Sequence, residues 1–442
     1  MPPFPCDEKE FAMKILVVGG GGREHAIIRA LQKSPLHPAL YCAPGNGGIG
    51  YDAACVDIKA TDVAAMVAYA KENAIDYAVV AQDDPLALGM VDAMAEAGIP
   101  SFGPNAAAAR IESSKVFSKN LMKKYGIPTA DYETFDDADA ALGYIRSRGK
   151  YPVVIKADGL ALGKGVLICE DEAAAEAGLK EIMLDKKFGA SGNRVVVEEF
   201  LTGPEVSVLS FCDGKTVIPM VSSMDHKRAL DGDEGLNTGG MGTVAPNPYY
   251  TPAVAAECME KIFRPTVAAM QAEGCPFKGC LYFGLMITPD GPKVIEYNCR
   301  FGDPEAQVVL PLLESDLLTI MQATTDGTLD KTEVKFRDGA AACVILASGG
   351  YPLAYEKGKE ITGLTNGQLP DAPDVTVYHA GTARRGDALV TAGGRVLGVT
   401  ATGSTLTQAL KTAYAAAERI HFDGAHKRSD IGRRALAALP NE

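Results

Sequence analysis

The chain has 442 residues, of which 47% are hydrophobic and 22% charged, and its 56 acidic against 43 basic residues give a formal net charge of −13. This composition is typical of a globular protein, and about 150 residues per domain suggests roughly three domains. The acidic charge argues against a nucleic-acid partner, because duplex binding needs a cationic face, but a few local Lys and Arg residues could still hold a small phosphorylated substrate. No apolar run approaches the ~18 residues that cross a bilayer, so we expect a cytoplasmic protein without a membrane partner. We also expect a monomer.

The cysteines and the first residues carry little functional signal. Ten Cys and six His are scattered, and no Cys-x-x-Cys pair occurs. A zinc site requires clustered ligands, so reduced, buried thiols are expected rather than a metal site or disulfides. Residues 1–12 lack the apolar segment of a secretory signal and predict a disordered leader.

The first third of the chain alternates strand and helix patterns. An apolar run at 14–18 ends at Gly19–Gly22, and residues 23–33 then place apolar side chains at helical spacing. Further strands are predicted at 39–43 and 76–81, and further helices at 62–73 and 86–97. This alternation predicts a Rossmann-like parallel sheet covered on both faces.

Two glycine-rich turns follow the first two strands of this sheet. The first does not match the Gly-x-Gly-x-x-Gly dinucleotide pattern, because the sixth position is Glu24 or His25. The second turn contains Asn46 and Gly47. Backbone N–H groups in such turns can bind phosphate, so Gly22, Asn46 and Gly47 are candidates for a sugar-phosphate site; a tight turn without a ligand is the alternative.

The middle of the chain places its strands in adjacent pairs, which favours antiparallel hairpins. The pairs are 151–156 with 166–169, 194–200 with 205–211, and 281–287 with 293–298. A helix is expected at 115–125, and the tail mixes short strands at 342–346 and 396–400 with a helix at 405–420.

The first hairpin carries a glycine-rich loop, 158–165, that lacks Walker spacing. A loop of this kind, including Gly163 and Lys164, can fold over a triphosphate and donate N–H groups. Lys156, two residues earlier, could neutralise phosphate oxygens. The alternative is a surface hairpin with a solvated lysine.

The next strand could supply a nucleotide-binding edge. Its backbone, from Glu198 through Glu199 and Phe200 to Leu201, could hydrogen-bond an adenine ring, and the carboxylate of Glu205 could hold ribose hydroxyls.

A later strand ends in an acid and an amide. Glu296 and Asn298 project to the same face of a strand, and two oxygen ligands suit Mg²⁺, which takes the rest of its shell from water and phosphates. The alternative is a solvated edge strand. Immediately afterwards, Arg300 could grip a carboxylate with both arms of its guanidinium group. A long polar stretch at 225–242, with Asp225 and Lys227 as substrate-binding candidates, has little apolar content and is typical of a functional loop.

Together these blocks resemble the phosphoribosylamine–glycine ligases, also called glycinamide ribonucleotide synthetases, of the ATP-grasp superfamily. The resemblance covers about 13–437. It depends on the joint presence, in order, of the blocks at 19–25, 44–48, 225–228, 237–242, 300–307 and 428–432.

The resemblance implies a multidomain α/β and α+β protein. Its expected parts are a Rossmann-like domain at 13–113, an ATP-grasp domain at 114–332 with a lid at about 135–205, and a C-terminal cap domain at 333–442. By analogy, Lys115 and Lys156 contact ATP phosphates, Glu198 to Leu201 form the adenine hinge, Glu205 binds ribose, and Glu296 and Asn298 hold Mg²⁺ or Mn²⁺. Residues 281–287 contain no carboxylate, so a second acidic ligand found in many ATP-grasp enzymes is missing.

The implied reaction is ATP-dependent ligation of glycine to 5-phosphoribosylamine in de novo purine biosynthesis. It passes through glycyl phosphate, with Arg300 on the glycine carboxylate and the transferred phosphoryl group. Three alternatives stay open: an ATP-grasp carboxylase, a nicotinamide oxidoreductase, and a nucleotide-binding module without catalysis.

Overall fold

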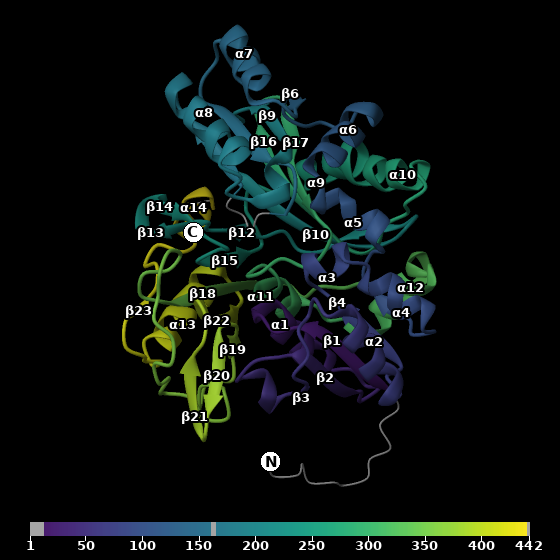
Figure 1. Ribbon diagram of the computed structural model, residues 1–442. Helices are drawn as coiled ribbons and strands as arrows, with labels where there is room; N and C mark the ends of the chain where they lie inside the picture. Colours follow the sequence, from purple (N-terminus) through teal and green to yellow (C-terminus); the bar gives the residue numbers. More distant parts are fainter. Residues whose placement is uncertain (1–12, 161–164, 440–442) are drawn as a thin grey trace.

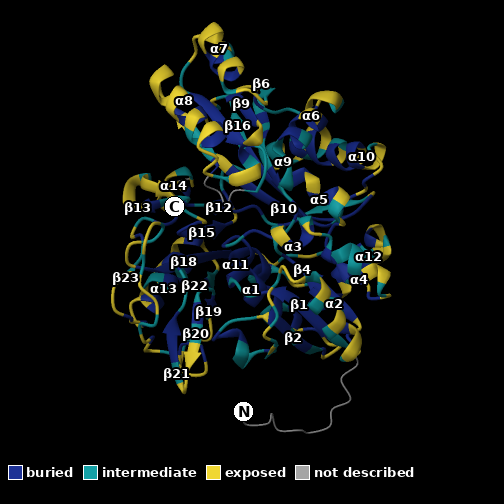
Figure 2. Ribbon diagram, in the orientation of Figure 1, coloured by how far each residue is buried: buried dark blue, intermediate teal, exposed yellow. Residues whose placement is uncertain are grey.

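The computed structural model describes residues 13–160 and 165–439. Figure 1 shows the amino-terminal sheet and the carboxy-terminal sheet side by side, with the middle of the chain above them. The strands of these sheets are largely buried, whereas the outer helices alternate buried and exposed faces (Figure 2). No helix in the described ranges is both long and apolar enough to span a membrane.

The amino-terminal sheet is parallel, as predicted. Its strand order is β3-β2-β1-β4-β5, with every neighbouring pair parallel. The strands are β1 (Lys14–Gly19), β2 (Ala39–Pro44), β3 (Ala54–Cys55), β4 (Tyr77–Val80) and β5 (Ser101–Phe102). Alternate side chains of β1 enter two different cores: Ile15 packs with α1 (Gly22–Leu31), and Leu16 with α2 (Val63–Glu72) and α4 (Met90–Glu96). Both faces are therefore covered.

The helix predicted at 86–97 is wrong as a single element. The chain instead forms α3 (Asp83–Ala87) and α4, separated at Gly89. Gly89 has φ +81°, a left-handed conformation that ends one helix and starts the next. Apolar spacing alone could not reveal this break.

Most of the segment predicted as a lid forms a four-stranded antiparallel sheet with its own small core, and this unit is called the lid below. Its order is β6 (Tyr132–Phe135), β9 (Val195–Glu199), β7 (Val153–Ala157) and β8 (Val166–Cys169). Two helices, α7 (Ala138–Arg148) and α8 (Glu172–Leu179), pack on it through buried side chains such as Leu142 and Leu179.

A second four-stranded antiparallel sheet forms the body beneath the lid. Its order is β11 (Val217–Pro219), β10 (Glu205–Asp213), β16 (Lys278–Thr288) and β17 (Gly291–Asn298). The hairpins β7–β8 and β16–β17 are confirmed. The predicted pairing of 194–200 with 205–211 is wrong, because β9 lies in the lid sheet and β10 in the body sheet. The connection between them thus links lid to body.

The carboxy-terminal sheet draws strands from two parts of the chain. Its order is β12 (Met224–Asp225), β15 (Gly242–Ala245), β18 (Ala340–Ser348), β22 (Arg395–Gly403) and β19 (Val375–His379), with β23 (Ala425–His426) beside β18. Helix α13 (Leu406–Ala417) packs against it. The polar stretch 225–242 is therefore a long excursion between two strands of this sheet.

Further elements include α5 (Ala106–Ser113), α6 (Lys115–Tyr125), η1 (Ile49–Tyr51), β13 (Arg228–Leu230), β14 (Glu234–Asn237), α11 (Ala306–Val309), β20 (Thr382–Arg385) and α14 (Arg433–Ala438).

Candidate active site

The predicted metal strand is built as its sequence suggests. Glu296 and Asn298 are partly exposed on one face of β17, while Tyr297 between them is buried, only 3% exposed, in the core. The neighbouring strand places Gly284 opposite Glu296. A Cβ at Gly284 would lie 3.2 Å from Glu296 Cγ, so the glycine leaves room for this carboxylate beside the sheet.

Four cationic side chains surround Glu296. Burial opposes ionisation of its carboxyl, but the positive charges of Lys227, Lys156, Lys115 and Arg300 lower its pKa. These groups come from the polar loop, the lid, helix α6 and the segment after β17. A carboxylate that feels the charges of four cationic side chains is suited to a polyphosphate together with a divalent cation.

Lys156 directly joins the lid to the metal strand. Its Nζ donates to the carbonyl oxygen of Ile295 at 3.0 Å and pairs with Glu198 Oε1 at 3.1 Å. The predicted neighbours Lys156 and Glu296 therefore face one site.

Glu198 holds two lysines at once. Its second oxygen, Oε2, lies 3.1 Å from Lys119 Nζ, and Lys119, Lys156 and Glu198 are each at most 4% exposed. Burial lowers the pKa of Lys119 to about 8, although the charge of Glu198 acts against this shift. Lys119 was missed from the sequence; its position four residues after Lys115, on the same face of one helix, was the available signal.

The predicted adenine hinge follows at the end of β9. Glu199 Oε1 lies 3.3 Å from Lys293 Nζ and accepts from the Asp131 N–H at 3.2 Å. Phe200 is 38% exposed, and the chain then continues through Leu201 into β10. The exposed aromatic ring of Phe200 could therefore stack on an adenine base.

The described start of the glycine-rich loop is anchored to helix α6. Asp158 Oδ1 accepts from the Ser114 hydroxyl at 3.0 Å and from the Val116 N–H at 2.9 Å, and Lys115 Nζ donates to the Gly159 carbonyl at 3.1 Å. Gly163 and Lys164 lie outside the described residues.

Arg300 is fixed by a buried carboxylate. Its Nη2 lies 2.7 Å from Glu112 Oε1, and Glu112 Oε2 accepts from the Cys299 N–H at 2.7 Å. The buried Nε of Arg300 has no protein hydrogen-bond partner within the described ranges. One donor of this guanidinium group is therefore left for a ligand.

The polar loop brings Lys227 to Glu205. Their side chains approach to 3.2 Å, and the charge of Glu205 is the main cause that raises the pKa of Lys227. Burial and the charge of Glu305 raise the pKa of Asp225 well above its usual value. Lys227 thus lies near Glu205 and Glu296, and Asp225 lies near Lys227 and Glu305.

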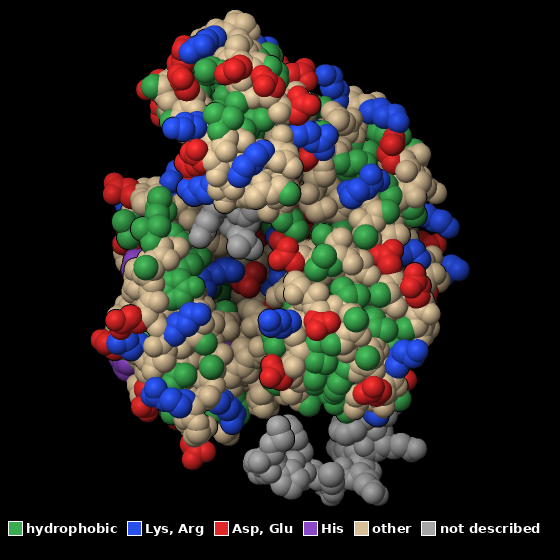
Figure 3. All heavy atoms as spheres, viewed as in Figure 1, with side chains coloured by type: hydrophobic (Ala, Val, Ile, Leu, Met, Phe, Trp, Pro, Cys, Tyr) green, Lys and Arg blue, Asp and Glu red, His purple; other side chains and the backbone are tan. Residues whose placement is uncertain are grey.

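A cavity of about 590 Å³ lies between the amino-terminal glycine turns and the carboxy-terminal lobe. Its lining includes Gly20, Gly21, Pro44, Gly45, Lys59, Asp303, Ala380, Gly381 and Arg395. Figure 3 shows the molecule hollowed between its lobes, with acidic and basic side chains inside the hollow.

The predicted sugar-phosphate residues lie next to this cavity. Gly22 begins α1, and a Cβ there would lie 2.5 Å from Gln307 Nε2. The Gly47 N–H donates to the Thr382 carbonyl at 3.0 Å. Asn46 donates to Gly20 and His379 and accepts from Gly48 and Ile49. The residues that line the cavity include their neighbours Gly20, Gly21 and Gly45. Gly22, Asn46 and Gly47 are not themselves among the described lining residues.

Comparison with known proteins identifies the family. Residues 13–112, 113–306 and 341–434 match models described as the N domain, the ATP-grasp (A) domain and the C domain of phosphoribosylglycinamide synthetase. The phosphoribosylamine–glycine ligase of Agrobacterium fabrum is 48% identical over 96% of this chain and 99% of its own length. That of Caldanaerobacter subterraneus subsp. tengcongensis is 47% identical over 95% and 99%.

The chain belongs to the phosphoribosylglycinamide synthetase family.

Solved structures agree on the fold. A Thermotoga maritima phosphoribosylamine–glycine ligase has a TM-score of 0.82 at 34% identity, covering 95% of this chain and all of that one. A Campylobacter jejuni biotin carboxylase has a TM-score of 0.74 at 16% identity, covering 94% of this chain and 93% of that one. At this identity the similarity concerns the fold alone.

The terminal block of this synthetase-family chain, 428–432, holds the polar loop in place. Arg428, 1% exposed, binds both carboxylate oxygens of Asp430 at 2.8 Å and reaches Asp233 at 3.0 Å. Asp430 Oδ2 also accepts from the Gly232 N–H at 2.9 Å. The block therefore connects the tail to the loop that carries Asp225 and Lys227.

This ion pair predicts an acid-sensitive contribution to stability. Burial raises the pKa of Asp430, but the hydrogen bonds from Arg428 and Gly232 outweigh it and lower that pKa from 3.8 to about 2. Because the folded-state pKa is depressed, the contribution is full above about pH 4 and is lost as the pH falls toward 2. Asp430→Asn should cost on the order of 1–2 kcal/mol at pH 7, measured by urea unfolding. That difference should shrink by pH 3, whereas Asp423→Asn, at an 83% exposed side chain, should change little; a deficit that is equal at both pH values would contradict this account.

Arg395 is a second residue that the sequence analysis missed. From the start of β22, its Nη1 donates to the carbonyl oxygens of Gly239 and Asp303, each at 2.6 Å. It thereby fastens the carboxy-terminal sheet to the polar loop and to the segment after Arg300. No prediction was made for Arg395 from the sequence, where the nearest expected element was the strand at 396–400.

Proposed function

We propose that the chain joins glycine to 5-phosphoribosylamine with ATP, giving glycinamide ribonucleotide, ADP and phosphate in de novo purine biosynthesis. The observation that carries this proposal is the convergence of Lys115, Lys156, Lys227 and Arg300 on Glu296, in a chain that matches all three domains of its family. A nicotinamide oxidoreductase and a passive nucleotide-binding module would need no such set.

ATP binds between lid and body in this proposal. Lys115 and Lys156 neutralise its phosphates; the prediction that Gly163 and Lys164 also contact them falls on residues outside the described ranges. The edge from Glu198 to Leu201, with Glu199 and Phe200, receives adenine, and Glu205 receives the ribose. Glu198 contributes through its ion pairs to Lys156 and Lys119 rather than as a free hydrogen-bonding group.

A divalent cation fits the end of β17. Glu296 is ionised, since its pKa is lowered, and Asn298 adds an amide oxygen on the same face. Two protein oxygens suit Mg²⁺ or Mn²⁺ that completes its shell with phosphates and water; among the described residues there is no group of three His, Cys, Asp or Glu side chains arranged for a metal. The bound cation would supply charge neutralisation at the β- and γ-phosphates.

Glycine must become an electrophile before an amine can attack it. Its carboxylate oxygen attacks the γ-phosphorus of ATP, ADP leaves, and glycyl phosphate forms. The amine nitrogen then attacks the carbonyl carbon, the C–O bond to phosphate breaks, and the amine loses a proton. Arg300 binds the glycine carboxylate and the transferred phosphoryl group, while Asp225 and Lys227 lie on the substrate side of the same cluster.

The 5-phosphoribosylamine fits the cavity between the glycine turns and residues 380–381. Lys59 and Arg395 add positive charge to the lining, which favours a phosphate. At the start of α1, the N–H groups of Gly21 and Arg23 already donate to Glu24 Oε2 and Asp303 Oδ2. Gly22, Asn46 and Gly47 support these turns. From the sequence we also propose domain boundaries at 113 and 332, and a monomeric, cytoplasmic protein.

The test is substrate-dependent phosphate release. Purified protein with ATP and Mg²⁺ should release phosphate only when glycine and freshly prepared phosphoribosylamine are both present. Release that ignores glycine, or that requires bicarbonate, would assign the chain to the ATP-grasp carboxylases instead.

A further inference from the structure

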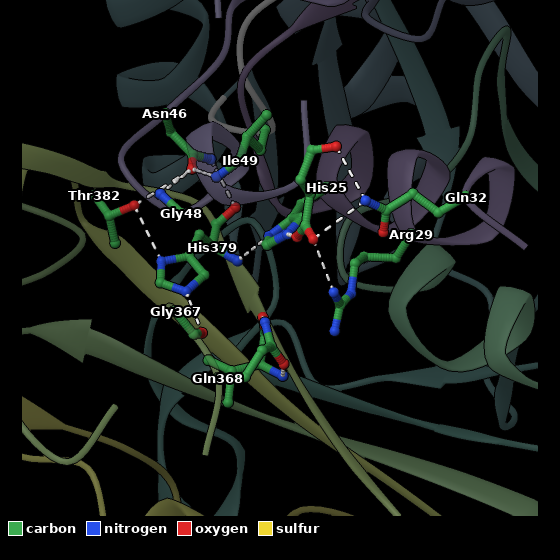
Figure 4. Close-up of polar contacts among 12 residues, drawn as sticks. His25, Arg29, Gln32, Asn46, Gly48, Ile49, Gly367, Gln368, His379 and Thr382 are labelled. Carbon is green, nitrogen blue, oxygen red and sulfur yellow. Dashed lines mark hydrogen bonds and ion pairs between the residues drawn. The ribbon is translucent and has the colours of Figure 1, made fainter. Parts of the chain in front are cut away.

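A hydrogen-bond chain links the amino-terminal glycine turns to the carboxy-terminal sheet. Figure 4 shows His25 of α1, Asn46 of the second turn and His379 at the end of β19 side by side. His25 and His379 are both fully buried. A buried polar group costs free energy unless it is hydrogen-bonded, so each ring nitrogen of these two histidines needs a partner.

His25 holds the backbone of His379. The His379 N–H donates to His25 Nδ1 at 2.8 Å, which leaves Nε2 as the protonated nitrogen, and Nε2 lies 2.8 Å from Asp52 Oδ2. Arg29 and Gln32 also bind Asp52. Burial lowers the pKa of His25, in keeping with a neutral ring that accepts on one side and donates on the other.

Asn46 holds the other backbone polar group of His379, its carbonyl oxygen. Its Nδ2 donates to the His379 carbonyl at 2.8 Å and to the Gly20 carbonyl at 2.9 Å. The backbone of His379 is thus bound on both sides by the amino-terminal lobe. The His379 ring fills the space where Gly48 lacks a side chain, since a Cβ there would lie 1.9 Å from the ring.

These contacts sit at the edge of the cavity of about 590 Å³. Ala380 and Gly381, directly after His379, form part of one wall, and Gly20, Gly21 and Gly45 form part of the other. Asn46 touches Gly20 and His379 together, so a shift of β19 changes the separation of the two walls.

We propose that His25 and Asn46 are positioning residues that set the width of this cavity and thereby its affinity for a sugar phosphate. The inference rests on the proposed function, which places 5-phosphoribosylamine there. The two walls carry Lys59 and Arg395. A phosphate bound by both side chains requires the walls at a fixed spacing, because hydrogen bonds weaken steeply with distance and angle.

Two substitutions separate the two contacts of His25. In His25→Asn the amide oxygen can take the place of Nδ1 and still accept from His379, whereas in His25→Gln the amide nitrogen can take the place of Nε2 and still donate to Asp52. His25→Gln leaves the buried His379 N–H without its acceptor, so β19 loses its contact with α1 and the KM for phosphoribosylamine should rise about tenfold or more. His25→Asn should stay within about threefold, and kcat and the KM for ATP should stay within about twofold in both.

Binding of ribose 5-phosphate, measured by calorimetry, tests two claims separately: that the cavity binds the sugar phosphate, and that His25 and Asn46 position its walls. If the wild-type protein does not bind it, the placement of the sugar phosphate in this cavity fails. If wild type and His25→Gln bind it equally, the cavity assignment stands and the positioning role is overturned. Equal losses for His25→Asn and His25→Gln would also overturn it.

Asn46→Asp provides a second variant should His25→Gln fail to fold. The aspartate keeps an acceptor for Gly48 and Ile49 but loses the donors to Gly20 and His379. We expect the same rise in KM for phosphoribosylamine, and an unchanged KM in a folded Asn46→Asp protein would contradict the proposal.

Discussion

Glu296→Gln should lower kcat by about 1,000-fold or more, because a metal-linked charge contributes several kcal/mol to phosphoryl transfer. Glu296 is also the anion at the centre of four cationic side chains. Its neutralisation leaves an excess of positive charge, so ATP without Mg²⁺ should bind the variant at least as tightly as it binds the wild type. Steady-state kinetics and ATP calorimetry without metal test both statements.

A matched control is Glu356→Gln, which removes an 81% exposed carboxylate from a surface ion pair with Lys359. It should leave kcat unchanged, because surface pairs contribute little. Retention of more than a tenth of the wild-type kcat by folded Glu296→Gln would remove Glu296 from the proposed metal site.

Arg300→Lys should lower kcat about 100-fold and raise the KM for glycine. Lysine keeps the charge but loses the planar fork that grips carboxylates and phosphates, and loss of a donor aimed at a developing oxyanion costs about 2.7–4 kcal/mol. The Nε of Arg300, without a protein partner in the described part of the chain, is the donor expected to matter. Glycine saturation curves measure both effects.

Glu112→Gln offers a graded comparison, since it weakens the 2.7 Å contact that orients Arg300. Its effect should be smaller, about tenfold. Arg146→Lys, on the 51% exposed side chain of Arg146, should be neutral. A near-normal KM for glycine in Arg300→Lys would assign glycine to another residue.

The architecture followed from local patterns. Alternating strands and helices predicted the parallel sheet around β1, and paired strands predicted the β7–β8 and β16–β17 hairpins. The exceptions depend on partners far along the chain. Apolar periodicity does not distinguish a strand that pairs with its successor from β9, which pairs with β6 and β7.

The proximity of candidate site residues could be predicted from the sequence where those residues lie within one short motif. Glu296, Asn298 and Arg300 come from one segment, and Lys156 meets that segment at Ile295. Arg395 meets Asp303, 92 residues away, and His25 meets His379, 354 residues away. Such contacts leave no pattern in the local sequence, because only folding brings the two side chains together.

The central claim is that ATP activates the carboxylate of glycine. The most direct measurement uses glycine labelled with ¹⁸O in both carboxylate oxygens, followed by mass spectrometry of the released phosphate. Transfer of the γ-phosphoryl group to a carboxylate oxygen predicts one ¹⁸O atom in each phosphate and one in the amide product. Phosphate without ¹⁸O from a complete turnover would contradict the account.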